Sequence, residues 1–181
     1  MTLVSPQAVV GPAFNSATYA YTSTLIYTMS SFQVTPTPLS MTASISFTWN
    51  GGSSTPIGNG AQQNGLPVIT GDNVLVFMVV SEDGTAVNTY TWTITRTPPP
   101  PPTILSATGG TLSAVVSFTA VAGLTYTVLS AAGVLVAGPS STSPITVMGL
   151  AAGTTYNFTV VASSVSAGPS VPSSVIIVTT T

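Results

Sequence analysis

The chain has 181 residues, of which 44% are hydrophobic and 2% are charged, against roughly 25% charged in an average soluble domain. It has one basic residue and no histidine, so it lacks the basic patch that binding to nucleic-acid phosphates requires. Because it has no cysteine, a disulfide framework and a thiolate metal site are excluded. The longest apolar run, 74–80, is far shorter than the roughly 18–20 residues of a membrane helix, so we expect no membrane span.

The first half of the chain alternates apolar and polar residues in short runs, which predicts β-strands with one buried face. Residues 1–11 fit an edge strand or a docking arm. The segment TPTPL at 35–39 is expected to break regular pairing, because proline cannot donate to a ladder. The run SISFTW at 44–49 predicts a half-buried strand. Residues 53–67 are rich in Gly, Asn, Gln and Pro and are expected to form a long loop.

The stretch 74–96 predicts a β-hairpin. Its apolar run VLVFMVV is followed by turn-forming SEDGTAVN and by alternating TYTWTITR. Asp83 and Gly84 are expected to supply the backbone geometry of the turn. If the hairpin turns about Gly84 and Thr85, Arg96 lies across from Asn73 and next to Asp72. We therefore hypothesise that Arg96 and Asp72 form an ion pair at the base of the hairpin.

Five consecutive prolines occupy 98–102 and exclude a helix or an inner strand. They predict a stiff polyproline spacer of roughly 15 Å. We expect a first domain over 1–97 that includes an N-terminal arm, a linker at 98–102 and a second domain over 103–181. Seven short runs with Gly- or Pro-containing turns predict a β-sandwich in the second domain. These expected strands are 103–108, 111–119, 124–130, 133–137, 144–148, 155–163 and 172–179.

Four motifs in the first domain carry a resemblance to a known family. They are PAFNSATYAY at 12–21, NGG at 50–52, GDN at 71–73, and EDGT followed by TYTWTITR at 82–96. With these motifs, about residues 10–97 resemble the cadherin-like β-sandwich domain, a module repeated in many bacterial surface proteins. The family name refers to the shape of the sandwich and does not imply the calcium sites of true cadherins.

The second domain carries Tyr126-Thr127-Val128 in an expected strand, and the segment LAAGTTY from Leu150 to Tyr156. With these residues, 103–181 resemble a fibronectin type III domain, and Leu150 to Tyr156 resemble its tyrosine corner. The chain departs from the family pattern at Ala152, where the corner usually has proline. The two resemblances imply an all-β protein of two tandem Ig-like/fibronectin-type β-sandwiches joined by a polyproline linker. They also imply surface modules used as spacers, adhesins or assembly parts, generally without catalysis.

The residues offer little for catalysis. Acid–base and nucleophilic routes need a positioned titratable group, and the chain has no His, Cys or Lys. Asp72 precedes the strand 74–80, while Glu82 and Asp83 follow it, so about 23 Å of strand separates them. A glycosidase pair sits roughly 5–9.5 Å apart. We therefore expect no enzyme, no cofactor and no metal site, and we prefer a turn over weak calcium binding at Glu82 and Asp83.

Two surface features remain open. Asn157-Phe158-Thr159 is an N-glycosylation triplet. We expect Asn157 to face outward, and we favour chance occurrence of the triplet unless the host glycosylates it. Several aromatic residues could form a carbohydrate platform, but their alternation on strands favours the core. We expect Tyr27 and Phe32 to be the more exposed aromatics. The aromatic residues expected in the core are Trp49, Trp92, Tyr19, Tyr21 and Phe77.

The scarcity of charge points to association, because sheet edges are normally guarded by charged residues, especially lysine, and low net charge favours association. We expect a non-enzymatic structural or assembly protein on a particle exterior, joined to other protein subunits in a homo- or hetero-oligomer. The N-terminal MTLVSPQAVV shows no secretory signal, which favours a virion component such as a capsid-associated, decoration or fibre protein. The alternatives are a secreted or cell-surface adhesin module that binds a glycan or a host protein, and an extracellular filament subunit.

Overall fold

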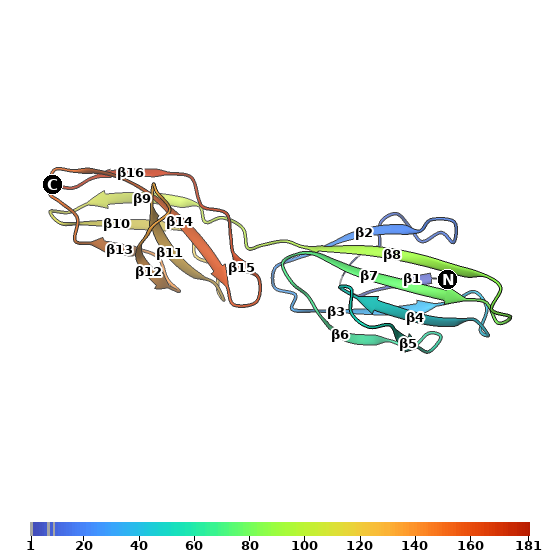
Figure 1. The fold of residues 1–181 in the computed structure, drawn as a ribbon. Helices are drawn as coiled ribbons and strands as arrows, with labels where there is room; N and C mark the ends of the chain where they lie inside the picture. Colours follow the sequence, from blue (N-terminus) through green and yellow to red (C-terminus); the bar gives the residue numbers. More distant parts are fainter. Residues whose placement is uncertain (1, 7, 9) are drawn as a thin grey trace. The chain divides into compact units, whose positions relative to one another are not determined.

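The computed structural model describes residues 2–6, 8 and 10–181 (Figure 1). This part of the chain contains sixteen strands and no helix, and therefore no helix long and apolar enough to cross a membrane. The chain divides into two compact units, residues 1–97 and 98–181. Each unit is a β-sandwich with its own buried side chains. The predicted all-β fold class of two tandem sandwiches is confirmed.

The first unit is built from eight strands in two sheets. Their bounds are β1 Thr2–Val4, β2 Ala20–Leu25, β3 Ser31–Thr37, β4 Ser44–Trp49, β5 Thr55–Ile57, β6 Gln63–Pro67, β7 Gly71–Val80 and β8 Val87–Arg96. One sheet has the order β2-β8-β7-β4-β5 and the other the order β1-β3-β6. Strand β2 runs parallel to β8, and the other strand pairs of this unit are antiparallel.

The core of the first unit lies between these two sheets. Trp92 from β8 is fully buried and its indole meets the ring of Phe32 from β3 edge-on, with centroids 5.2 Å apart. Phe77 from β7 is also fully buried. Alternate residues of β3, β7 and β8 face this core, because successive side chains of a strand point to opposite faces.

The predicted break at 35–39 is wrong for its first residues. Strand β3 continues through Thr37, and Pro36 lies opposite Leu3 of β1. The carbonyl of Pro36 accepts from the amide of Gly60 at 3.0 Å, so its nitrogen faces the same side, away from β1. The missing N–H of Pro36 therefore removes no bond of the β1–β3 ladder.

The long loop predicted for 53–67 is also wrong, because this segment contains β5 and β6. Strand β5 lies at an edge of the five-stranded sheet, where Pro56 pairs with Ser46. Strand β6 lies at an edge of the three-stranded sheet. Short edge strands tolerate proline and glycine because they pair on one side only. Composition alone therefore did not predict β5 and β6.

The second unit also has eight strands in two sheets. Their bounds are β9 Ile104–Gly109, β10 Ser113–Phe118, β11 Thr125–Ser130, β12 Leu135–Ser140, β13 Ile145–Met148, β14 Thr155–Ser164, β15 Gly168–Pro169 and β16 Ile176–Thr179. One sheet has the order β13-β10-β9; the other has β12-β11-β14, with β15 and β16 pairing different parts of β14. The two sheets form the β-sandwich that was predicted for this unit.

The proline run 98–102 falls within the second compact unit. Pro102 is buried, and Pro100 to Pro102 line a hollow of that unit together with Leu124 and Tyr126. The run thus contributes side chains to the second sandwich, and its role as a spacer stays a prediction.

Candidate interaction site at the open end of the first unit

The β7–β8 hairpin ends in a turn that is held by Asp83. Its carboxylate accepts from the hydroxyl of Ser81 at 2.6 Å and from the amide of Thr85 at 3.0 Å. Gly84 has a φ of 72°, a left-handed conformation that glycine adopts without strain. The Ser81 hydroxyl, followed by the Thr85 amide and hydroxyl, lowers the pKa of Asp83 to about 2. Asp83 is therefore negatively charged at physiological pH. Its carboxylate already accepts hydrogen bonds from residues of the turn.

Beyond this turn, β8 has an open edge. The pairing of β2 with β8 starts opposite Thr91, whose amide donates outward to the carbonyl of Tyr19 at 2.8 Å. Backbone direction alternates along a strand, so Thr89 and Val87 present their N–H and C=O groups to the same side. Within the described residues no strand lies beside them. By contrast, β2 has an antiparallel bridge to Gly11.

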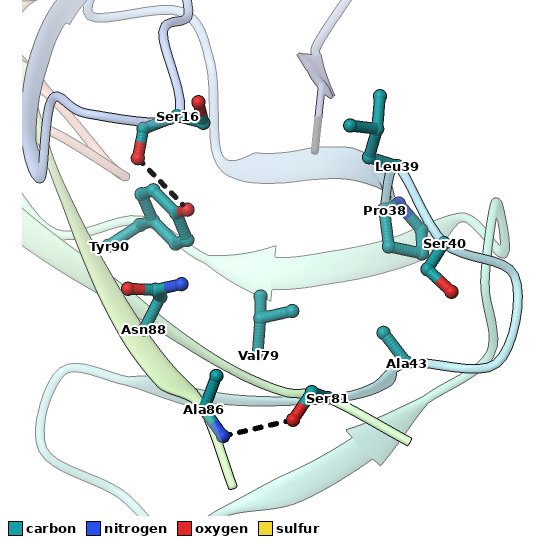
Figure 2. Close-up of a pocket in the computed structure, with 10 residues that line it drawn as sticks. All are labelled: Ser16, Pro38, Leu39, Ser40, Ala43, Val79, Ser81, Ala86, Asn88 and Tyr90. Carbon is teal, nitrogen blue, oxygen red and sulfur yellow. Dashed lines mark hydrogen bonds between the residues drawn. The ribbon is translucent and has the colours of Figure 1, made fainter. Parts of the chain in front are cut away.

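A hollow of about 230 Å³ adjoins this strand end (Figure 2). Figure 2 shows Asn88 and Tyr90 entering it from β8 and Val79 from β7, with Pro38 and Leu39 on the opposite side. The loop after β3, in place of a strand, covers the inner face of the hairpin here. The residues that line the hollow are Ser16, Pro38, Leu39, Ser40, Ala43, Val79, Ser81, Ala86, Asn88 and Tyr90.

The walls of the hollow are neutral. Burial, followed by the neighbouring Tyr19, raises the pKa of Tyr90, so its hydroxyl stays protonated and donates to the carbonyl of Ser16 at 3.3 Å. A second hollow beside it, of about 590 Å³, shares Ser40 and Ser81 and adds the carboxylates of Glu82 and Asp83. Among the residues that the structure describes, no group of three or more His, Cys, Asp or Glu side chains is placed to hold a metal ion. The site thus offers apolar contact, hydroxyls, one amide and open strand edge, which are means of binding.

The hypothesised ion pair between Arg96 and Asp72 is not formed. The hairpin turns one residue earlier than assumed, so Arg96 lies opposite Gly71 and Asp72 lies opposite Thr95. Neighbouring residues of a strand face opposite sides of the sheet. Asp72 is exposed and accepts from the hydroxyl of Thr95 at 2.6 Å, whereas Arg96 points inward.

Arg96 is instead a buried structural residue, with 1% of its surface exposed. Its Nη1 donates to the carbonyl of Val68 at 3.0 Å, and its Nη2 donates to the carbonyl of Tyr27. Removal from water lowers the pKa of the guanidinium. The sole basic side chain of the protein thus fastens two loops to the end of β8 and is not available to a ligand at the surface.

Asn73 is a second buried polar residue, and sequence reasoning missed its role. It is fully buried; its Oδ1 accepts from the amide of Ile69 at 2.9 Å, and its Nδ2 donates to the carbonyls of Ile69 and Ile94. Asn50 also donates to Asn73 Oδ1, at 3.2 Å. The sequence did contain a signal for this role. Asn73 directly precedes the apolar run 74–80, so a polar residue leads into a buried strand.

In the second unit, Tyr156 makes the contact expected of a tyrosine corner. Its hydroxyl accepts from the amide of Ala151 at 2.8 Å, next to Leu150, whose own amide donates to Leu112. Tyr126 makes an equivalent contact with the amide of Val121 at 2.6 Å. Each tyrosine thus ties the turn before its own strand to that strand.

Asn157, the acceptor of the glycosylation triplet, is exposed on β14, where it lies opposite Ile177 of β16. The ring of Phe158, which follows it, is buried and stacks on Tyr156, with centroids 5.9 Å apart. The outward direction of Asn157 agrees with the expectation, and the choice between chance occurrence and glycosylation stays open.

The aromatic residues divide differently from the prediction. Trp92 is buried and donates to the hydroxyl of Ser23 at 2.7 Å, and Tyr21 and Phe77 are buried as expected. Phe32 was expected to be exposed, which is wrong, because it fills the core at 0% exposure. Tyr19 was expected in the core but is 50% exposed. It precedes β2 and lies next to the part of β8 that has no neighbouring strand among the described residues.

The remaining two aromatics are half-buried. Trp49 donates from its indole nitrogen to the carbonyl of Pro67 at 2.9 Å and stacks on Phe32 with centroids 6.1 Å apart. Tyr27 contributes its carbonyl to Arg96. The ring of Trp49 thus packs at the rim of the core.

Tandem fibronectin type III proteins are among the solved structures that are similar to the chain. The FN1-FN3 domains of chicken CNTN1 share 15% identity at a TM-score of 0.41, and the match covers 96% of this chain and 66% of that one. The two fibronectin type-III domain segment from chicken tenascin shares 15% identity at a TM-score of 0.38, with 97% and 99% covered. No curated protein matches the chain.

A family model described as the cadherin-like beta sandwich domain matches residues 2–97. The match includes all eight strands of the first unit, and it starts before residue 10, where the sequence motifs placed the domain. Domains of this kind are typically extracellular binding or structural modules without catalysis. The match spans more than half of the 181 residues, and the chain therefore belongs to the cadherin-like beta sandwich domain family.

Proposed function

We propose that this protein is a non-enzymatic structural subunit that works by being joined to other polypeptides on the exterior of a particle. The observation that carries the proposal is the almost uncharged surface. Of the four charged side chains, Arg96 is buried, which leaves Asp72, Glu82 and Asp83 at the surface. The second unit, 98–181, has no charged side chain. Subunits of this kind can pack closely without the repulsion that keeps proteins apart.

Exposed apolar side chains support the same proposal. Leu39 beside the hollow is 96% exposed, and Met41 in the same loop is 72% exposed. In the second unit, Met148 and Ile177 are exposed on different sheets. Exposed apolar side chains favour association because their burial releases water.

The open edge of β8 supports a specific mode of joining. A segment laid along Val87 and Thr89 would continue the position of β2 in the sheet, and its inward side chain would enter the hollow beside Tyr90. Strand addition of this kind gains affinity from backbone bonds and specificity from side-chain pockets.

The test uses a proline that blocks the edge. The amide of Thr89 faces outward, as that of Thr91 does, so Thr89→Pro removes an edge donor and no β7–β8 bond; Thr89→Val is the matched control. We expect the wild type and Thr89→Val to associate in sedimentation velocity and Thr89→Pro to sediment as a smaller species. A wild-type chain that stays a monomer up to about 100 μM, where standard interfaces are normally populated, would contradict the proposal. Association that survives Thr89→Pro would contradict the strand mode alone.

The particular form we propose is a virion component, such as a capsid-associated, decoration or fibre protein. A shell packs many copies at high density, which suits a surface without like-charge repulsion. Mass spectrometry of purified particles tests this: the chain should be present in fixed stoichiometry with the shell protein. Recovery from the cell surface without particles would favour an adhesin, and recovery in continuous fibres would favour a filament subunit.

The alternative of glycan binding has one supporting observation. Hydroxyls of Ser16, Ser40 and Ser81 and the amide of Asn88 line the hollow next to Tyr90, which is the neutral polar and aromatic lining that sugars bind. A glycan array with the wild type and Asn88→Ala tests it. Signals that depend on Asn88 would support an adhesin, and uniform silence would exclude it.

A further inference from the structure

Three Asn-Gly steps occur within sixteen residues of the first unit, at 50–51, 59–60 and 64–65. In such a step the backbone nitrogen of the glycine can attack the side-chain carbonyl carbon of the asparagine, because glycine has no Cβ to hinder the approach. The reaction requires the asparagine side chain to rotate until its carbonyl carbon reaches that nitrogen. Hydrogen bonds that hold the side-chain amide therefore oppose it.

Two of the three asparagines are held in this way. Asn50 donates from Nδ2 to Asn73 at 3.2 Å and accepts at Oδ1 from the amide of Val74 at 2.7 Å. Asn59 donates from Nδ2 to the carbonyl of Met41 at 2.6 Å. Rotation of either side chain breaks bonds worth about 1 kcal/mol each.

Asn64 differs from both. It is exposed, and its side-chain amide makes no hydrogen bond in the part of the chain that the structure describes. Gly65 has a φ of 69° and open space where a Cβ would lie, which leaves room for a ring. The pairing of β6 with β3 shifts here from Gln63 to Leu66, so Asn64 and Gly65 form a bulge and are not held by a regular ladder.

We propose that Asn64 is a site of spontaneous deamidation, while Asn50 and Asn59 are protected by the fold. The nitrogen of Gly65 bonds to Cγ of Asn64, the bond from Cγ to Nδ2 breaks, and the side-chain nitrogen leaves as ammonia with the proton that Gly65 gives up. The product is a cyclic succinimide. Water then adds to one of its two carbonyls and opens the ring, leaving aspartate or isoaspartate at position 64. No oxidant, metal or enzyme is needed.

The modification changes the electrostatics of an edge strand. It adds one negative charge to a chain whose formal net charge is −2, and it places that charge on β6, which lies at the edge of its sheet. Charges on edge strands oppose pairing with a further chain. We therefore expect the β6 edge to be negatively charged in aged molecules and neutral in freshly made ones.

The experiment incubates the full chain at about pH 8 and follows each asparagine by mass spectrometry of chymotryptic peptides. Deamidation at Asn64 should be about fivefold faster than at Asn59, which one hydrogen bond of about 1 kcal/mol protects, and about thirtyfold faster than at Asn50, which two such bonds protect. In denaturant, where these bonds are lost, the three rates should converge. Equal rates in the folded chain, or protection of Asn64, would overturn the proposal.

Asn64→Gln is the matched variant, because it retains the amide and lengthens the side chain, so that attack forms a less favourable six-membered ring. In this variant the early acidic species seen by isoelectric focusing should disappear, while the far-ultraviolet circular dichroism should match that of the wild type. Persistence of that species in Asn64→Gln would assign the charge change to another residue and refute the proposed site.

Discussion

Arg96 shows how a single residue can be misjudged from its charge. In a chain with one basic side chain, an ion pair or an anchor for a ligand is the natural expectation. The structure uses the guanidinium as a donor to backbone carbonyls of Val68 and Tyr27, where several fixed donors on a long side chain fasten two loops. The physical reason is that buried carbonyls need partners, and arginine can serve more than one of them.

We expect Arg96→Met to lower the free energy of unfolding of the first unit by about 2–4 kcal/mol, because at least two carbonyls lose a charged donor. Both tryptophans of the protein lie in this unit, so tryptophan fluorescence in denaturant reports its unfolding. The control is Asp72→Asn, which should change stability by less than about 0.5 kcal/mol at an exposed position. A comparable loss in both variants would restore the ion-pair hypothesis.

Asp83 gives a second prediction at this scale. Its pKa of about 2 depends first on the hydroxyl of Ser81, so Ser81→Ala should raise the pKa toward the ordinary aspartate value of 3.8. NMR titration of the side-chain carboxyl carbon of Asp83 measures this pKa. Thr95→Ala, which removes a partner of Asp72, should leave the Asp83 titration unchanged. A pKa near 2 in Ser81→Ala would mean that the Thr85 donors suffice.

At the scale of elements, the tyrosines act as ties between a turn and its following strand. Tyr21 accepts from the amide of Asn15 at 3.2 Å and donates to its carbonyl at 2.6 Å. Tyr126 and Tyr156 bind the amides five residues before them. In each case the ring packs beside the core and the hydroxyl reaches the rim, which is the division that a tyrosine side chain favours.

Tyr156→Phe should therefore destabilise the second unit by about 1 kcal/mol, the usual net value of one hydrogen bond. Amide hydrogen exchange should also become faster at Ala151, while exchange at Val121, which is bound to Tyr126, stays as in the wild type. Calorimetry of the full chain measures the stability, and exchange locates the effect. Unchanged exchange at Ala151 would show that the tyrosine acts only through its ring.

Over the whole molecule, the scarcity of titratable groups has a direct consequence for pH. The chain has no histidine, cysteine or lysine, so no side chain with an ordinary pKa titrates between about pH 5 and pH 9. Asp83 has a folded-state pKa of about 2, below the ordinary aspartate value of 3.8. Its contribution to stability is therefore complete above about pH 4 and is lost as the pH falls toward 2.

We accordingly expect the midpoint of thermal unfolding to change by less than about 2 °C between pH 5 and pH 9, and to fall below pH 4 as Asp83 is protonated. Differential scanning calorimetry over this range checks it. In Asp83→Asn the acid-induced fall should be smaller than in the wild type. A steep change near pH 6.5 would require a titrating group that the sequence does not contain.

Much of the architecture follows from local pattern. The run 74–80 and the alternation of 89–96 predict β7 and β8, because a short apolar run bounded by turn residues and a period of two are typical of buried and half-buried strands. Where Pro and Gly are frequent, as in 53–67, the pattern fails, since edge strands β5 and β6 are held by partners far along the chain. Local composition contains no information on those partners.

The sequence by itself determined the all-β class, the resemblance to the cadherin-like family and the absence of His, Cys and Lys chemistry, because these depend on residue type and short-range periodicity. Only the tertiary structure decided the hydrogen-bond partners of Arg96 and Asn73 and the burial of Phe32. It also decided which edge of β8 is open and how the surroundings of the three Asn-Gly steps differ. A shift of the hairpin turn by one residue gives Arg96 a different cross-strand partner. Such register, and with it the partner of each polar group, is settled by packing between sheets.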